Sequence, residues 1–196
     1  LIYVNQVGGQ DELVFDGGSF VLNDKAKKIL SLPSWESNDT LISWKIEPKG
    51  KLSYELQSDS IKKNTTQEVY SALVLGLRDY IHKNNFKGVI IGMSGGIDSA
   101  LTACIATDAL GSDKVRCIMM PSIYTSEESL SDAKECSDLL EVKYSVINIK
   151  GVLDEYKCIF NNIFNGLDED ETEENIQSRV RGAVLMAVSN KFGDMV

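Results

Sequence analysis

Short apolar runs in the first part of the chain alternate with polar residues, which is the pattern of half-buried strands. We expect strands at residues 12–15, 19–22 and 40–46. The D-G-G sequence at 16–18 is a turn signal, so we predict that 19–22 returns beside 12–15. The stretch 48–64 is polar and poor in apolar residues, and we interpret it as a linker.

From residue 65 onward, apolar positions at helical spacing alternate with short unbroken apolar runs. We predict helices at 65–83, 100–110, 125–140, 152–164 and 174–190, with strands at 89–91, 115–119 and 144–149. Thr65 and Thr125 each precede a Glu by three residues, which predicts capping boxes. The helix at 65–83 places Val69, Leu73, Leu77 and Tyr80 on one face.

Strands separated by helices of this length predict parallel pairing with right-handed crossovers. The expected fold class is therefore α/β, an open doubly wound parallel sheet. Sheets of this kind bind their ligands beyond the carboxyl ends of the strands.

Composition limits the classes of function. The chain has 196 residues, 43% of them hydrophobic, and a net charge of −9, which is typical of a globular domain and argues against a nucleic-acid binder. No apolar run approaches transmembrane length, so we expect no membrane partner. The four cysteines are far apart, without a C-x-x-C pair, which favours buried thiols in a reducing compartment and a cytoplasmic location.

The segment with the clearest chemistry reads G-M-S-G-G-I-D-S over residues 92–99, between a predicted strand and a predicted helix. Gly95 and Gly96 lack Cβ, so the backbone can turn tightly and bring N–H groups close to an anion. The start of the following helix adds unpaired N–H groups and the positive end of its dipole. The backbone of this loop therefore predicts a phosphate site.

The side chains of the loop extend this prediction. Ser94 and Ser99 supply hydroxyl donors for phosphate oxygens. A carboxylate beside a bound phosphate is repulsive unless a cation lies between them, so Asp98 is predicted to be a Mg²⁺ ligand. The alternative is a glycine turn with Ser99 as helix N-cap and Asp98 on the surface. No Lys follows the glycines and G-x-G-x-x-G is absent, which excludes the P-loop and the dinucleotide fingerprint.

Residues 94–99 resemble the S-G-G-x-D-S signature of the ATP pyrophosphatase superfamily. The resemblance implies a Rossmann-like sheet of the adenine nucleotide alpha hydrolase type, and a loop that holds the pyrophosphate released when ATP adenylates a substrate. The residues implied to bind ATP and pyrophosphate are Gly92, Met93, Ser94, Gly95, Gly96, Ile97, Asp98, Ser99 and Ser122. NAD, GMP and asparagine synthetases and tRNA-thiolating enzymes all belong to this superfamily, and the loop alone does not choose among them.

Residues 5–19, N-Q-V-G-G-Q-D-E-L-V-F-D-G-G-S, narrow the choice. They resemble the late part of the nitrilase-type glutaminase domain that is fused to glutamine-dependent NAD synthetases. GMP and asparagine synthetases use unrelated glutaminases. The alternative is a generic glycine-rich hairpin.

Two further segments resemble the same family. Residues 119–126, M-M-P-S-I-Y-T-S, look like the strand-end loop near the adenine of ATP, although a proline turn and helix cap would explain Ser122 equally well. Residues 173–182, E-E-N-I-Q-S-R-V-R-G, resemble the family's E-N-I-Q-x-R-x-R helix start. The resemblance implies that Asn175 contacts deamido-NAD and that Arg179 helps with a phosphate or carboxylate, the alternative for Arg179 being a solvated helix face. The acidic run 168–174 is predicted to be a surface loop.

These resemblances imply three regions: the C-terminal part of a glutaminase domain at 1–47, the linker at 48–64, and an ATP pyrophosphatase domain at 65–196. The family's Glu-Lys-Cys triad would precede residue 1 and a T-T-G-N-K-S-E segment would follow residue 196, so we expect the chain to be part of a longer protein. The implied reaction adenylates deamido-NAD with ATP and Mg²⁺. Ammonia from glutamine then gives NAD, AMP, pyrophosphate and glutamate, in an enzyme expected to be a homo-oligomer.

Two rival functions stay open at this point. One is a different amidating or thiolating ATP pyrophosphatase. The other is a regulatory module that binds an adenine nucleotide on the same fold without turnover. Fold alone does not separate them.

Overall fold

The structure, a computed structural model, describes residues 1–50, 52–54, 64–122 and 125–196. Contacts divide the chain into two units, Leu1–Tyr80 and Ile81–Val196, with the boundary inside helix α1 (Thr65–Lys83). Most of the predicted linker at 48–64, namely residues 51 and 55–63, lies outside the described residues.

The first unit consists of short antiparallel strands and most of α1. The strands are β1 (Ile2–Tyr3), β2 (Val7–Gln10), β3 (Leu13–Asp16), β4 (Phe20–Leu22), β5 (Lys28–Ser31), β6 (Trp44–Ile46) and β7 (Leu52–Tyr54), with a 3-10 turn η1 (Pro48–Gly50). They pair in the order β1-β4-β5, with separate hairpins β2-β3 and β6-β7. Val21, Ile29 and Leu30 form the buried core of this unit.

The predicted pairing of 12–15 with 19–22 is wrong. β3 pairs with β2, and β4 pairs with β1 and β5. Gly17 and Gly18 both have positive φ, at 71° and 56°, and the Gly17 N–H donates to the Gln6 carbonyl. Two successive left-handed residues turn the chain away from β3, so that β4 joins a different sheet.

The strand predicted at 40–46 is shorter than expected. Only Trp44–Ile46 is extended and paired. Its partner β7 lies inside the segment interpreted as a linker. Pairing with β6 therefore orders part of a sequence whose composition carries no strand signal.

Helix α1 has the predicted bounds but a different cap and a different buried face. The Asn64 side chain accepts from the N–H of Thr66 at 3.1 Å, so the capping residue precedes the predicted Thr65. Leu75 is buried, whereas Val69, Leu73 and Tyr80 of the predicted face are all exposed.

Contacts with the β2-β3 hairpin explain the orientation of α1. An ideal Cβ on Gly76 would lie 3.2 Å from the Val14 side chain. The Gly9 N–H donates to Asp79 Oδ2 at 2.8 Å. A small residue and a carboxylate therefore decide which face of α1 meets the hairpin, and neither belongs to the hydrophobic pattern.

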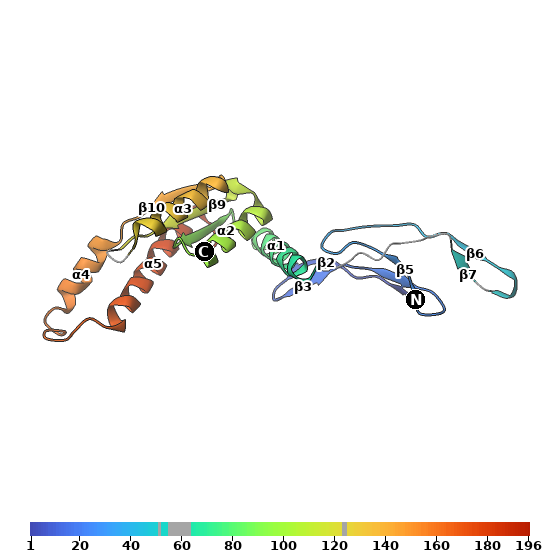
Figure 1. Ribbon diagram of the computed structural model, residues 1–196, viewed down its shortest axis with the longest axis horizontal. Coiled ribbons are helices and arrows are strands. Elements are labelled where there is room, and N and C mark those ends of the chain that lie inside the picture. The colour runs from blue at the N-terminus through green and yellow to red at the C-terminus, as the bar shows by residue number, and fades with distance from the viewer. Residues whose placement is uncertain (51, 55–63, 123–124) are drawn as a thin grey trace. The chain divides into compact units, whose positions relative to one another are not determined.

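The second unit is a parallel α/β sheet, which confirms the predicted fold class. Strands β8 (Val89–Met93), β9 (Val115–Met119) and β10 (Lys143–Val146) lie side by side in parallel (Figure 1). The connections contain α2 (Ile97–Leu110), η2 (Ser112–Lys114) and α3 (Glu127–Leu139), and α4 (Lys150–Phe160) and α5 (Glu171–Phe192) follow β10. A parallel bridge between Val89 and Met195 lies on the free edge of β8, so the chain continues on the other side of its first parallel strand, as in a doubly wound sheet.

Several boundaries in this unit differ from the prediction. α2 begins three residues earlier, at Ile97, and α3 is capped by Ser126 rather than Thr125, with Ser126 Oγ accepting from the Ser129 N–H at 3.1 Å. β10 ends at Val146 and α4 ends at Phe160. The apolar pattern continues past the end of β10, because Ile147 and Ile149 of the following loop still pack in the core. Past the end of α4, Phe164 stacks on Phe160, whereas Ile163 is 72% exposed.

The acidic run 168–174, predicted to be a surface loop, instead contains the start of α5. Asp170 is its N-cap: Asp170 Oδ1 accepts from the Thr172 N–H at 2.8 Å, and Glu173 Oε2 accepts from the Asp170 N–H at 2.9 Å. The hydrogen bonds from Thr172 lower the pKa of Asp170. Carboxylates at a helix N-terminus are stabilising, so the run is a capping box rather than an unstructured segment.

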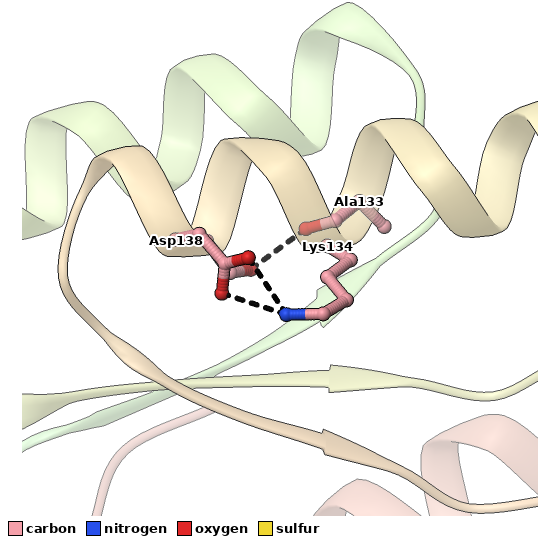
Figure 2. Close-up of polar contacts among 4 residues, drawn as sticks. Ala133, Lys134 and Asp138 are labelled. Atoms are coloured by element: carbon pink, nitrogen blue, oxygen red, sulfur yellow. Dashed lines mark hydrogen bonds and ion pairs between the residues drawn. The ribbon is translucent and has the colours of Figure 1, made fainter.

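Helix α3 carries an ion pair on its exposed side. Lys134 and Asp138 lie one turn apart, and Lys134 Nζ lies 2.7 Å from Asp138 Oδ2 (Figure 2). Both side chains are about 60% exposed, so the pair adds only about 0.3–0.5 kcal/mol. The opposite side of α3 carries the fully buried Ala133 and packs on the sheet.

A difference in burial predicts that two cysteines differ in reactivity. Cys117 on β9 is fully buried, and burial raises the pKa of its thiol to about 11, whereas Cys158 on α4 is exposed. At pH 8 only about one Cys117 thiol in a thousand is then a thiolate. We expect iodoacetamide to alkylate Cys158 in the native protein and to spare Cys117, as measured by peptide mass mapping. Equal labelling of both before unfolding would contradict the burial of β9.

Candidate functional site

The loop predicted to bind phosphate lies at the carboxyl end of β8, where the strand passes into α2. β8 ends at Met93, and α2 begins at Ile97 after three connecting residues. β9 ends beside β8 in register, with Met93 opposite Met119. The predicted loop therefore lies at the edge of the parallel sheet where such folds bind ligands.

Gly95 holds the loop against the next helix. Its φ is +80°, and an ideal Cβ there would lie 2.5 Å from the Ser129 carbonyl oxygen and 2.7 Å from Ser129 Cα. Only glycine adopts this conformation without strain and leaves room for the first turn of α3. Position 95 thus requires glycine for two reasons: the positive φ and the close approach of the loop backbone to Ser129.

The two serine hydroxyls of the loop form a hydrogen bond with each other. Ser94 Oγ lies 3.1 Å from Ser99 Oγ, and Ser99 Oγ also donates to the Gly96 carbonyl at 2.9 Å. In return, the Ser94 N–H donates to Ser99 Oγ at 3.2 Å. These contacts close the loop into a ring and keep both hydroxyls at its exposed rim.

The N-terminus of α2 is open to an anion. Its N-cap is Gly96, which has no side chain to occupy the first-turn N–H groups. The first intrahelical bond runs from the Ala100 N–H to the Gly96 carbonyl, so the amides before Ala100 have no acceptor inside the helix. The alternative in which Ser99 caps the helix does not hold, because Ser99 lies in the first turn.

Asp98 is exposed and also lies in the first turn of α2, next to the loop. Within the described parts of the chain, no group of three or more His, Cys, Asp or Glu side chains is arranged to hold a metal ion. A single carboxylate nevertheless fits Mg²⁺ at a nucleotide site, because that ion usually takes one or two carboxylates and completes its shell with phosphate oxygens and water.

A cleft of about 380 Å³ opens beside the loop. Its lining residues come from the end of β8, the end of β9, the start of α3 and the middle of α5: Gly92, Met93, Ser94, Met119, Met120, Thr125, Ser129, Arg181 and Leu185. Three of the predicted nucleotide residues, Gly92, Met93 and Ser94, therefore face one cavity. The apolar groove between α2 and α3 is instead lined by Gly95, Gly96 and Ile97, of which Ile97 is 79% exposed.

Ser122 lines a second cleft of about 460 Å³, together with Thr125, Arg181 and the acidic start of α5. The Ser122 N–H donates to Thr125 Oγ1 at 3.0 Å, so Ser122 belongs to a local turn as well. Its neighbours Ile123 and Tyr124, part of the predicted adenine loop, lie outside the described residues.

The two α5 residues predicted to bind deamido-NAD are not among the described residues that line either cleft. Asn175 and Arg179 are exposed, and an Arg179 Nη donates to the Asn175 carbonyl at 3.1 Å. Gln177 and Arg181, on the neighbouring side of the same helix, do line the second cleft.

Arg181 is one of the cleft residues to which sequence reasoning gave no role, although it lies in the same R-x-R motif as Arg179. Helical spacing places residues two apart on different sides of a helix, but it does not say which of the two sides faces the cleft. Ser129 was also missed, because its contact with Gly95 comes from the packing of α3.

Comparisons with known proteins support one family. The family model described as NAD synthase matches residues 69–196. The chain belongs to the NAD synthase family. It is 42% identical over 196 residues to the glutamine-dependent NAD(+) synthetase of Acinetobacter baylyi and 43% identical over 197 residues to that of Rhodobacter capsulatus. All of this chain is matched in each case, but only 36% and 35% of those relatives.

A solved structure of another NAD synthase family member matches the fold. The glutamine-dependent NAD+ synthetase of Acinetobacter baumannii, in complex with adenosine diphosphate, superimposes with a TM-score of 0.91 and 41% identity. The match covers 98% of this chain and 36% of that one. The chain thus spans about a third of the length of the curated relatives that it matches, in both sequence and structure.

Proposed function

We propose that this chain forms the ATP-using part of a glutamine-dependent NAD synthetase. The observation that carries the proposal is the glycine-serine loop at residues 94–99, in which Gly95 packs against α3 and Ser94 lines the cleft at the end of the parallel sheet. The match of the whole chain to 36% and 35% of two glutamine-dependent NAD(+) synthetases supports the choice of substrate. The ADP held by the A. baumannii relative supports the choice of nucleotide.

In the proposed reaction, the carboxylate of deamido-NAD attacks the α-phosphate of ATP, giving an adenylate and pyrophosphate. The open amides at the start of α2 and the hydroxyls of Ser94 and Ser99 bind the pyrophosphate and stabilise the charge that it gains. Asp98 would hold Mg²⁺, which when bound neutralises phosphate charge. Ammonia from glutamine then displaces AMP and gives NAD.

The remaining assignments complete the proposal. Residues 1–47 would be the end of a glutaminase domain, 48–64 a linker, and 65–196 the ATP pyrophosphatase domain. Gly92 to Ser99 and Ser122 would bind the nucleotide, and Asn175 and Arg179 the deamido-NAD. The protein would be cytoplasmic and homo-oligomeric, and would not bind nucleic acid. None of the described helices is long and apolar enough to cross a membrane.

A substrate panel on the intact protein that contains this chain tests the function. With ATP, Mg²⁺ and glutamine, we expect pyrophosphate release and NAD formation only when deamido-NAD is present. Xanthosine monophosphate and tRNA, the acceptors of related ATP pyrophosphatases, should give no release. A nucleotide-binding module without turnover would bind ADP but release no pyrophosphate with any acceptor, and that result would refute the proposal.

A further inference from the structure

Among the described residues, one charged side chain lines the cleft beside the predicted phosphate loop. Of the described residues that line it, only Arg181 carries a charge, and the others are glycine, hydroxyl or apolar side chains. A cation among such walls interacts with an anion more strongly than a cation in open water, because the effective dielectric constant is lower. This cleft therefore favours an anionic ligand.

A backbone carbonyl positions the guanidinium of Arg181. Arg181 is half-buried, and its Nε donates to the carbonyl of Met120, directly after β9, at 3.4 Å. Among the residues that the structure describes, no carboxylate lies within ion-pair distance of it. A guanidinium has five N–H donors, so the Nη groups remain available to a ligand.

The surroundings of Arg181 also indicate which of two clefts an anionic ligand would occupy. Arg181 lines two clefts. One of them is also lined by Ser94, and the other is also lined by Glu173 and Glu174. An anion is repelled by the carboxylates of the latter cleft, whereas in the former the hydroxyls of Ser94, Thr125 and Ser129 can donate hydrogen bonds to it. The two clefts therefore differ in the charge of the ligand that they favour.

We propose that Arg181 contacts a phosphate group of the nucleotide bound at the Ser94–Ser99 loop. Arginine suits this role because its planar fork binds two phosphate oxygens at once. The inference rests on the proposed function and adds to it a nucleotide contact from α5, distinct from the substrate role proposed for Arg179. The hydrogen bond from Arg181 to Met120 would hold the guanidinium beside this nucleotide.

Nucleotide binding to the intact protein tests this role. We expect Arg181→Gln to weaken ADP binding by about tenfold to a hundredfold and to leave the binding of adenosine, which has no phosphate, unchanged. Arg181→Lys, which keeps the charge but not the fork, should recover part of the loss. Lys191→Gln removes a positive charge from an exposed position of the same helix and serves as the matched control, with ADP affinity unchanged.

Two results would overturn the inference. Arg181→Gln could leave ADP affinity unchanged, or it could weaken ADP and adenosine equally, as a general distortion of α5 would. NAD formation by the wild-type protein, measured in parallel, separates this test from that of the proposed function. If wild-type protein makes NAD while ADP affinity is independent of Arg181, only the role of Arg181 fails.

Discussion

Replacing Asp98 with alanine in the intact protein should abolish pyrophosphate release while leaving the fold in place. Asp98 is exposed in the first turn of α2, so its removal leaves no cavity. The cost to stability should be limited to the loss of a favourable charge at a helix N-terminus, about 0.3–1 kcal/mol. The cost to the reaction should be far larger, because phosphate charge normally neutralised by Mg²⁺ would remain.

We expect the rate with saturating ATP and deamido-NAD to fall by at least about a hundredfold, which corresponds to about 2.7 kcal/mol of barrier. The measurement is the steady-state rate of pyrophosphate release, with the melting temperature recorded for the same samples. Asp98→Asn keeps the size of the side chain and removes its charge, so it should fail in the same way.

Asp108→Ala is the matched control, since Asp108 is also exposed but lies near the other end of α2. It should retain the wild-type rate. If Asp98→Ala released pyrophosphate as fast as the wild type, the assignment of Asp98 as the metal ligand would be wrong, whatever happened to the rest of the proposal.

Gly95→Ala should damage both stability and nucleotide binding. A non-glycine residue at φ +80° costs about 1–3 kcal/mol in strain. The new Cβ would also lie 2.5 Å from the Ser129 carbonyl oxygen, and backbone at that distance has to move. Because α3 and the loop would be pushed apart, we expect the open amides of α2 to lose their position and ADP binding to weaken.

Urea unfolding monitored by circular dichroism measures the first effect, and titration with ADP measures the second. We expect a loss of more than about 2 kcal/mol in the free energy of unfolding. Gly182→Ala is the control, since a Cβ there would meet nothing within 4 Å and the residue lies inside α5. That substitution should stabilise the protein by up to about 1 kcal/mol. If Gly95→Ala kept the wild-type free energy of unfolding and the wild-type ADP affinity, the close approach of the loop to α3 would matter for neither.

Local signals in the sequence were sufficient for the architecture of the second unit. Strand, loop and helix follow from apolar runs, from a change of hydrophobic period and from Gly95 and Gly96, all of which act over a few residues. The parallel sheet followed from the length of the connections. The predicted phosphate loop lies at the end of β8 because its residues are contiguous in the chain, so no long-range contact was needed to bring them together.

Tertiary packing decided the features that depend on which surfaces meet. The turn at Gly17 and Gly18 can be predicted from the sequence, but the sheet that β4 joins after this turn cannot. The sequence contains the apolar positions of α1, but not the contact at Gly76 that orients the helix. Arg179 and Arg181 are two residues apart in the sequence, and only the tertiary contact between Arg181 and Met120 shows which of them borders the cleft. Each of these outcomes depends on contacts between residues far apart in the chain, whose energies no local pattern records.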